Sequence, residues 1–230
     1  MTKKEMLEAE RARKREEKLK AEMARIDALK EYERKYESEG YVCGIDEVGR
    51  GPLVGPVVTA CVILPEDFVL DGLTDSKKLS EKKRDMFYDI IMEKAISVGI
   101  GIMDEDVIDK VNIYEATKLA MYQAVDNMSV KPDYILIDAM KLDKLDVPST
   151  SIIKGDLKSI TISAASVIAK VTRDRMMYEL DKKYPMYKFA KNKGYPTKDH
   201  IEAISKYGIL KEHRKTFKPV TEHVNRIYNK

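Results

Sequence analysis

YVCGIDEVGRGPLVGPVVTACVIL, residues 41–64, is the stretch of this 230-residue chain that decides the fold. Its first apolar run, 41–45, has the composition of a β-strand and leads directly into two carboxylates, Asp46 and Glu47. A glycine-rich turn follows, and a second β-branched run, 57–64, leads away from it. The pattern predicts two strands joined by a turn, with two acidic side chains at the end of the first strand.

Two adjacent carboxylates at the end of a buried strand indicate a bound cation. Leaving both charges unpaired would cost roughly several kcal/mol, whereas a divalent metal with oxygen ligands makes the same groups a binding site. The alternative is a hairpin whose exposed turn is acidic. Because neighbouring side chains of a regular strand point to opposite faces, we expect the strand to end or bend at Asp46 and Glu47 if both bind one metal centre.

The turn after this pair has the residues of a ligand contact. Gly49 and Gly51 flank Arg50, so that backbone N–H groups can approach a ligand closely. The guanidinium of Arg50 offers a fork of donors that suits a phosphate group. Gly49, Arg50 and Gly51 are therefore candidate substrate-binding residues.

Two later segments repeat the arrangement of an apolar run followed by an acid. Asp138 ends the run DYILID, and Asp156 follows SIIKG. Open α/β sheets bind ligands at the carboxyl ends of their strands. Together with Asp46 and Glu47, these two residues predict a cluster of carboxylates that a metal stabilises.

Composition indicates a soluble globular protein. An apolar fraction of 43% over 230 residues is enough to build a core for one substantial domain. We find no apolar run of membrane-spanning length, and the N-terminus is too polar for a signal peptide. Cys43 and Cys61 lie in apolar runs without metal-ligand spacing, so we expect reduced core cysteines and a cytoplasmic location.

Charge is unevenly distributed along the chain. Residues 170–230 hold 16 Lys+Arg and 7 Asp+Glu, a net charge of +9, whereas residues 41–169 hold 14 and 21, a net charge of −7. An acidic catalytic body beside a basic C-terminal region fits a polyanionic partner that is cut at a metal centre. The alternative is that the basic helices are simply solvated.

Residues 1–40 predict a charged helical extension that ends at Gly40. Apolar side chains recur in it every three or four residues and form one stripe. They are Leu19, Met23, Ile26, Leu29, Tyr32 and Tyr36. We expect the second half to pack on the body or on another protein, the first half to be mobile, and residues 1–38 to be dispensable for chemistry.

Two lysines mark a candidate phosphate contact. Lys77 and Lys78 precede Ser80, which is predicted to cap a helix running to about residue 94. Backbone donors and lysines at a helix N-terminus suit a phosphate, so Lys77 is a candidate substrate-binding residue. The alternative is an ordinary basic surface.

Two further candidates lie in the C-terminal half. The predicted helix 159–183 begins with small residues that permit close approach of the sheet or of a ligand, and Ser166 and Lys170 share one of its faces at i, i+4 spacing. Tyr195 lies in a Gly-Tyr-Pro turn flanked by lysines, where it can stack on a sugar or base. The alternative for Tyr195 is a packed turn residue.

The remaining elements follow from periodicity. Alternation predicts a strand at 96–103, and helical spacing predicts helices at 114–128 and 199–207. The acidic residues between 104 and 109 are predicted to start a helix rather than to bind metal, because negative charge is favoured in a first turn.

Seven separated motifs resemble those of bacterial ribonuclease HII, in the order of that family. They are GIDEVGRGPLVGPVV (44–58), DSKKLS (75–80), LID (136–138), KGD (154–156), SAASVIAKVTRD (163–174), NKGYPT (192–197) and HR-x-x-F-x-PV (213–220). The resemblance implies an α/β fold of the ribonuclease-H-like type, a five-stranded mixed sheet flanked by helices. The catalytic domain would span 41–230, with a basic helical region from about residue 184.

The resemblance also implies roles for single residues. The catalytic and metal-binding carboxylates would be Asp46, Glu47, Asp138 and Asp156. The segment Gly49–Gly51 would read the 2′-hydroxyl of a ribonucleotide in duplex DNA, and Tyr195 would pack against the deoxyribose on its 3′ side. The 2′-hydroxyl is the group that distinguishes a ribonucleotide from its DNA neighbours. The chain departs from the family at Ala139-Met140, where many relatives have Gly-Asn.

The implied activity is endonucleolytic cleavage on the 5′ side of ribonucleotides embedded in duplex DNA, and of RNA in RNA–DNA hybrids, leaving 3′-hydroxyl and 5′-phosphate ends. Such an enzyme removes ribonucleotides and degrades RNA primers. Two Mg²⁺ or Mn²⁺ ions would activate the attacking water and stabilise the leaving oxygen. We expect a monomer with no membrane partner. The alternatives are ribonuclease HIII and a non-catalytic hybrid-binding module, and the turn at Arg50 and the helical N-terminus favour ribonuclease HII.

Overall fold

Five strands form one mixed sheet in the order β3-β2-β1-β4-β5, in a computed structural model that describes residues 3–228. The strands are β1 (Val42–Val48), β2 (Val57–Ile63), β3 (Ser97–Met103), β4 (Tyr134–Asp138) and β5 (Ser149–Ile152). The β1–β2 and β2–β3 pairs are antiparallel, whereas β1–β4 and β4–β5 are parallel. The predicted five-stranded mixed sheet is confirmed.

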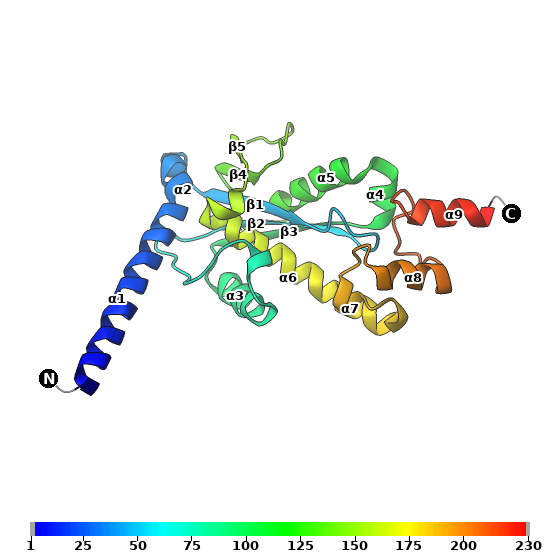
Figure 1. The fold of residues 1–230 in the computed structure, drawn as a ribbon. Coiled ribbons are helices and arrows are strands. Elements are labelled where there is room, and N and C mark those ends of the chain that lie inside the picture. The colour runs from blue at the N-terminus through cyan, green and yellow to red at the C-terminus, as the bar shows by residue number, and fades with distance from the viewer. Residues whose placement is uncertain (1–2, 229–230) are drawn as a thin grey trace.

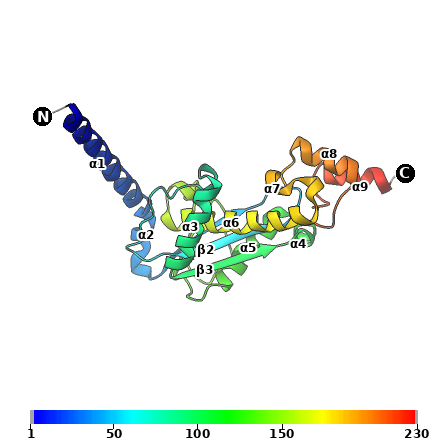
Figure 2. The same cartoon turned by 90° about the horizontal axis from the view of Figure 1, so that it is seen from below.

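Helices cover both faces of this sheet. The helices are α1 (Lys3–Leu29), α2 (Glu31–Tyr36), α3 (Glu81–Lys94), α4 (Glu105–Val111), α5 (Ile113–Asp126), α6 (Ile160–Lys183), α7 (Phe189–Asn192), α8 (Lys198–Tyr207) and α9 (Val220–Tyr228). Short 3₁₀ turns lie at η1 (Glu37–Glu39), η2 (Ser76–Lys78), η3 (Gly155–Leu157) and η4 (Pro185–Tyr187). Figures 1 and 2 show α3 and α6 on one face of the sheet and α5 on the other.

Strand β2 explains why the sheet needs both layers. Alternate side chains of a strand point to opposite faces. Val58, Ala60 and Val62 pack in the core under α3 and α6, whereas Cys61 and Ile63 pack in the core under α5. The whole strand is buried, as its continuous apolar run predicts.

Glycines bring α5 close to the edge strand β3. A Cβ at Gly99 would collide with the carbonyl oxygen of Ala124, and a Cβ at Gly101 would collide with that of Ala120. The alternating glycines of SVGIGIM therefore create a shallow groove for the helix. Ala116, Ala120 and Ala124 of α5 are buried, whereas Leu119 is exposed.

The predicted helix starts are confirmed by their caps. Ser80 Oγ accepts from the N–H of Lys83 (3.4 Å), and Asp104 Oδ1 accepts from the N–H of Val107 (2.9 Å). The acidic run after residue 103 thus starts α4, as its charge indicates. Within residues 3–228, no helix combines the length and the apolar character needed to cross a membrane.

The N-terminal extension packs on the body only through its last turns. Ile26 and Leu29 are buried in the core under α3 and α6, and Tyr36 stacks on Tyr134 of β4 with ring centroids 3.9 Å apart. Leu19 and Met23 of the predicted stripe are exposed, because α1 leaves the body and projects away from it (Figure 1), so the stripe packs on the body only at its later positions. That residues 1–38 are dispensable for chemistry stays a prediction.

A carboxylate of the extension also caps the longest helix of the catalytic domain. Glu33 Oε1 accepts hydrogen bonds from the backbone N–H of Thr161 (3.0 Å), from Thr161 Oγ1 (2.7 Å) and from Ser159 Oγ (2.6 Å). These groups belong to the N-terminal turn of α6, where unpaired N–H donors and the helix dipole favour negative charge. The extension and the catalytic domain are therefore joined by a specific polar contact.

We predict that Glu33→Ala lowers the free energy of unfolding by about 2 kcal/mol, because charge-assisted hydrogen bonds at a helix N-terminus are lost. Urea denaturation followed by circular dichroism measures the change. Glu31→Ala is the matched control, since Glu31 is exposed on the same helix. Equal stabilities of the two variants would contradict the capping role.

Candidate active site

The first two carboxylates lie within a strand that does not end at them. β1 continues through Asp46 and Glu47 to Val48, and pairs Asp46 with Ala60 and Glu47 with Thr59. The expectation that the strand ends or bends at this pair is therefore wrong. Asp46 is buried, and its Oδ1 accepts from the N–H of Glu47 at 2.7 Å.

Asp138 lies beside Asp46 because their strands run in parallel. Ile45 of β1 is in register with Ile137 of β4, so the next residue of each strand is an aspartate. Sheet register thus brings together two acids that are 92 positions apart in the sequence. This is the arrangement predicted from their positions at the carboxyl ends of apolar runs.

Asp156 reaches the same region from a turn rather than from a strand end. β5 ends at Ile152, and Asp156 lies in the following 3₁₀ turn η3, which corrects the predicted position. The N–H of Gly155 donates to Asp138 Oδ1 (2.7 Å), and a Cβ at Gly155 would lie 3.3 Å from the same oxygen. Glycine therefore permits the close approach that ties this turn to Asp138.

The carboxylates destabilise one another's charged forms. Burial, with the charges of Glu47 and Asp138, raises the pKa of Asp46 well above its usual value. Burial also raises the pKa of Glu47, although Arg50 opposes this, and burial with the charge of Asp138 raises the pKa of Asp156. A cation among these groups would relieve both the desolvation and the repulsion.

The donor set fits a hard divalent metal. Glu47 Oε2 is buried without a hydrogen-bond partner within the described residues, so one carboxylate oxygen is free to act as a ligand. Across residues 3–228, no three Asp, Glu, His or Cys side chains lie at metal-ligand spacing. Mutual repulsion keeps like charges apart, and a cation is what draws such oxygens together. The assignment of the four carboxylates as metal ligands stays a prediction.

Lys77 and Ser166 lie near the first aspartate of this cluster, and their role as substrate contacts stays a prediction. Burial lowers the pKa of Lys77, but attraction to Asp46 and other carboxylates outweighs burial and leaves that pKa raised. Ser166 Oγ hydrogen-bonds to Ser76 Oγ (2.9 Å), and a hydrogen bond from Ser166 opposes the rise in the pKa of Asp46. The turn η2 and helix α6 therefore meet at the first aspartate.

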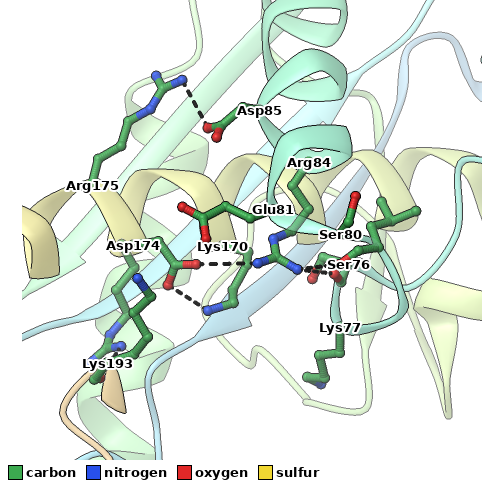
Figure 3. A network of polar contacts seen from close by, with 12 residues as sticks. Ser76, Lys77, Ser80, Glu81, Arg84, Asp85, Lys170, Asp174, Arg175 and Lys193 are labelled. Atoms are coloured by element: carbon green, nitrogen blue, oxygen red, sulfur yellow. Dashed lines mark hydrogen bonds and ion pairs between the residues drawn. The ribbon is translucent and has the colours of Figure 1, made fainter. Parts of the chain in front are cut away.

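Lys170 does not lie at the carboxylate cluster. Its Nζ pairs with Asp174 Oδ1 (2.5 Å), and Arg84 approaches the other oxygen of Asp174 at 3.8 Å, as Figure 3 shows. Arg84 also donates to the carbonyls of Ser76 (3.1 Å) and Leu79 (2.6 Å), which holds the turn that carries Lys77. Ser166 and Lys170 thus share one face of α6 but contact different groups, Ser166 at the carboxylate cluster and Lys170 at Asp174.

The loop between β1 and β2, which we call the Gly-Arg-Gly loop (residues 49–56), lies beside the turn of Tyr195. The N–H of Leu53 donates to the carbonyl of Gly194 (2.7 Å). A Cβ at Gly51 would lie 3.4 Å from Tyr195 Cε1. The Arg50 side chain is partly exposed and lies 3.4 Å from Glu47 Oε1. The Gly-Arg-Gly loop therefore borders the carboxylate cluster at Glu47, and Tyr195 lies against this loop.

Two buried arginines contact this loop and were missed in the sequence. Arg173 and Arg214 are both fully buried and donate to backbone carbonyls of the loop. Both lie inside motifs quoted above, so membership of a motif was the signal in the sequence that could have pointed to them. Their role could not be predicted, because the acceptors are main-chain carbonyls from distant parts of the sequence.

The residue after Asp138 has a backbone conformation that favours glycine. Ala139 has φ +49, in the left-handed region, which glycine adopts more readily than other residues. A non-glycine residue in this region costs about 1 kcal/mol or more. The departure at this position therefore retains the glycine-type backbone that follows the aspartate.

Comparisons with known proteins identify the family of this chain. The chain matches the family described as Ribonuclease HII over residues 43–220. It is 59% identical to Ribonuclease HII of Bacillus cytotoxicus over 92% of this chain and 82% of that protein. Its structure resembles ribonuclease H2 from Pyrococcus horikoshii, with a TM-score of 0.70, 26% identity, and coverage of 82% of this chain and 99% of the other. Bst-RNase HIII in complex with Mn²⁺ shares the fold, with a TM-score of 0.58, 18% identity, and coverage of 83% and 71%.

The matched region contains all four predicted carboxylates, the Gly-Arg-Gly loop and Tyr195. Both the family match and the relative at 59% identity extend over most of the chain. The chain therefore belongs to the ribonuclease HII family of ribonuclease H endonucleases, which cleave RNA in RNA–DNA hybrids and remove ribonucleotides.

Proposed function

We propose that this enzyme cuts on the 5′ side of a single ribonucleotide embedded in duplex DNA, leaving 3′-hydroxyl and 5′-phosphate ends. The observation that carries the proposal is that the Gly-Arg-Gly loop meets Glu47 through Arg50 and meets Tyr195 through Gly51. A group that reads one sugar then lies next to a group that can hydrolyse the adjoining phosphodiester. Cleavage of RNA in hybrids uses the same contacts.

Asp46, Glu47, Asp138 and Asp156 would hold divalent ions. Burial favours this assignment, because ionised carboxylates in such surroundings need a cation. Two Mg²⁺ or Mn²⁺ ions would supply an activated water and stabilise the leaving 3′ oxygen. Lys77, whose charged form these carboxylates favour, would bind a non-bridging phosphate oxygen.

Backbone donors of the Gly-Arg-Gly loop are arranged for a sugar hydroxyl. The carbonyls of Gly49 and Arg50 both accept from Arg214, so the N–H groups of Arg50 and Gly51 point the other way across their planar trans peptides. Neither N–H donates to a protein group within residues 3–228. Such adjacent free donors bind an oxygen ligand, here the 2′-hydroxyl. Tyr195, which is 41% exposed, would pack on the neighbouring deoxyribose.

The basic C-terminal region would hold the duplex through its phosphates. Residues 170–230 carry a net charge of +9, and α7, α8 and α9 lie together at the end of the molecule opposite α1 (Figure 1). Phosphate contacts of this kind position a duplex without reading its sequence. We propose a monomeric enzyme, and its two buried free cysteines suit the cytoplasm.

We predict that Asp46→Asn stabilises the metal-free protein. The pKa of Asp46 is raised by folding, so its stabilising contribution is present at low pH and is lost as the pH rises through the folded value. At neutral pH the amide removes a repulsive charge, and the unfolding temperature in EDTA should rise by about 2–4 °C. Asp126→Asn, at an exposed position, is the control and should change nothing. Addition of Mg²⁺ should stabilise the wild type more than Asp46→Asn, and an equal response would remove Asp46 from the ligand set.

We predict that the wild type nicks a duplex with one embedded ribonucleotide only when Mg²⁺ or Mn²⁺ is present. Asp46→Asn should lower the rate roughly a hundredfold or more, because ligand loss removes several kcal/mol of charge stabilisation, and duplex binding should persist. Gel analysis of end-labelled strands measures both the rate and the cut position. Cutting only within longer RNA runs would instead favour the activity of ribonuclease HIII, and binding without cutting would favour a hybrid-binding module.

We predict that Tyr195→Ala weakens cleavage at a single ribonucleotide by about tenfold to a hundredfold, since one stacking contact contributes roughly 1–3 kcal/mol. Binding to plain DNA should change less. Tyr114→Ala serves as the control, because Tyr114 is similarly exposed at the start of α5. Equal losses on both substrates would reduce Tyr195 to a structural residue of its turn.

A further inference from the structure

The Gly-Arg-Gly loop is held by a side chain from the far end of the sequence. Arg214 is fully buried, and its guanidinium donates five hydrogen bonds to loop carbonyls. The acceptors are the carbonyls of Gly49 (2.6 Å), Arg50 (3.0 Å), Pro52 (2.8 Å) and Gly55 (2.9 and 2.7 Å). All five N–H donors of one arginine thus fix the path of one loop.

Arg173 of α6 joins the same loop to the turn that carries Tyr195. Its guanidinium donates to the carbonyls of Val54 (3.0 Å), Pro56 (3.0 Å) and Lys193 (2.9 Å). Gly49 has φ +93, and a Cβ there would collide with the guanidinium of Arg173. The first glycine of the loop is therefore required for the arginine to approach.

Both guanidinium groups are charged and are stabilised by carbonyl dipoles rather than by carboxylates. Within the described part of the chain, neither has a carboxylate oxygen within 4.0 Å. Burial lowers the pKa of Arg173 to about 10, and burial together with repulsion from Arg173 lowers the pKa of Arg214 to about 9. A lysine could not replace either one, because its ammonium lacks the planar fork that reaches several carbonyls at once.

The orientation of the loop's free donors depends directly on Arg214. Its Nη2 and Nη1 hold the carbonyls of Gly49 and Arg50, so the N–H groups of Arg50 and Gly51 face away from it. If these carbonyls were released, the two peptide planes could rotate and turn the donors away from the sugar. Recognition of a single hydroxyl requires donors that are already in place.

We propose that Arg214, braced by Arg173, is a positioning residue that sets the preference of the enzyme for a ribonucleotide over a deoxyribonucleotide. It contacts no substrate and acts through the backbone of the Gly-Arg-Gly loop. The inference rests on the proposed function, in which that loop binds the 2′-hydroxyl. It adds a determinant of specificity on the opposite side of the loop from the substrate.

The test measures affinity for two duplexes that differ by one 2′-hydroxyl. Fluorescence anisotropy with Mg²⁺ is carried out in the Asp46→Asn background, which prevents turnover, with and without Arg214→Lys. We expect Arg214→Lys to reduce the ratio of the two affinities about tenfold, the effect of losing about 1.4 kcal/mol of discrimination. Affinity for plain DNA should stay within about twofold, because the basic C-terminal surface is unchanged.

Two controls separate positioning from general loss of stability. Arg175→Lys changes an exposed arginine two positions from Arg173 on α6, and Ile91→Ala creates a buried cavity in α3, away from the loop. Both should leave the affinity ratio unchanged. Should Arg214→Lys not fold, Arg173→Lys is measured in the same way, because it also releases loop carbonyls.

An unchanged affinity ratio in Arg214→Lys would overturn the inference, as would an equal fall in the ratio for Ile91→Ala. The single variant Asp46→Asn shows whether the proposed function holds. Equal affinities of that protein for the two duplexes would refute reading of the 2′-hydroxyl itself, and the inference would fall with it. A preference in Asp46→Asn that survives Arg214→Lys would refute the inference alone.

Discussion

The close approach of helix α6 to strand β1 is the contact on which the rest of the structure depends. A Cβ at Gly44 would collide with the backbone of Thr161 and Ile162, so glycine in the centre of the strand lets the helix lie directly on the sheet. The small residues at the start of α6, Ala164 and Ala165, are buried in this layer. Ala164 and Ala165 face the sheet rather than a ligand. From the sequence, the small residues at the start of this helix could have permitted close approach of either one.

From this position, polar groups of α6 make contacts in three parts of the molecule. Its first turn receives Glu33 from the N-terminal extension, Ser166 meets the first aspartate of β1, and Arg173 reaches the Gly-Arg-Gly loop. A helix fixed against a strand holds such groups in place, because close-packed interiors deform little. One rigid element therefore sets the relative positions of the carboxylates and of the loop that would read the sugar.

Buried charge is handled in two opposite ways in this protein. The carboxylates of β1 and β4 repel one another, and burial and this repulsion raise the pKa values of Asp46 and Glu47. Arg173 and Arg214, in contrast, donate eight hydrogen bonds to carbonyls and so need no counter-ion. The first group would gain from a bound cation, as proposed above, whereas the second holds backbone.

The sequence by itself determined the sheet, most helix boundaries and the family, because apolar periodicity, caps and motif order are local properties of the chain. It also singled out Asp46 and Asp138 as candidate metal ligands, since each acid follows an apolar run. Only the tertiary structure decided that β1 continues past Glu47, that Asp156 lies in a turn tied to Asp138, and that Lys170 engages Asp174. It alone identified the role of Arg214, whose partners are main-chain carbonyls more than 150 positions away, because every residue has a carbonyl and no sequence pattern marks which ones a distant guanidinium will bind.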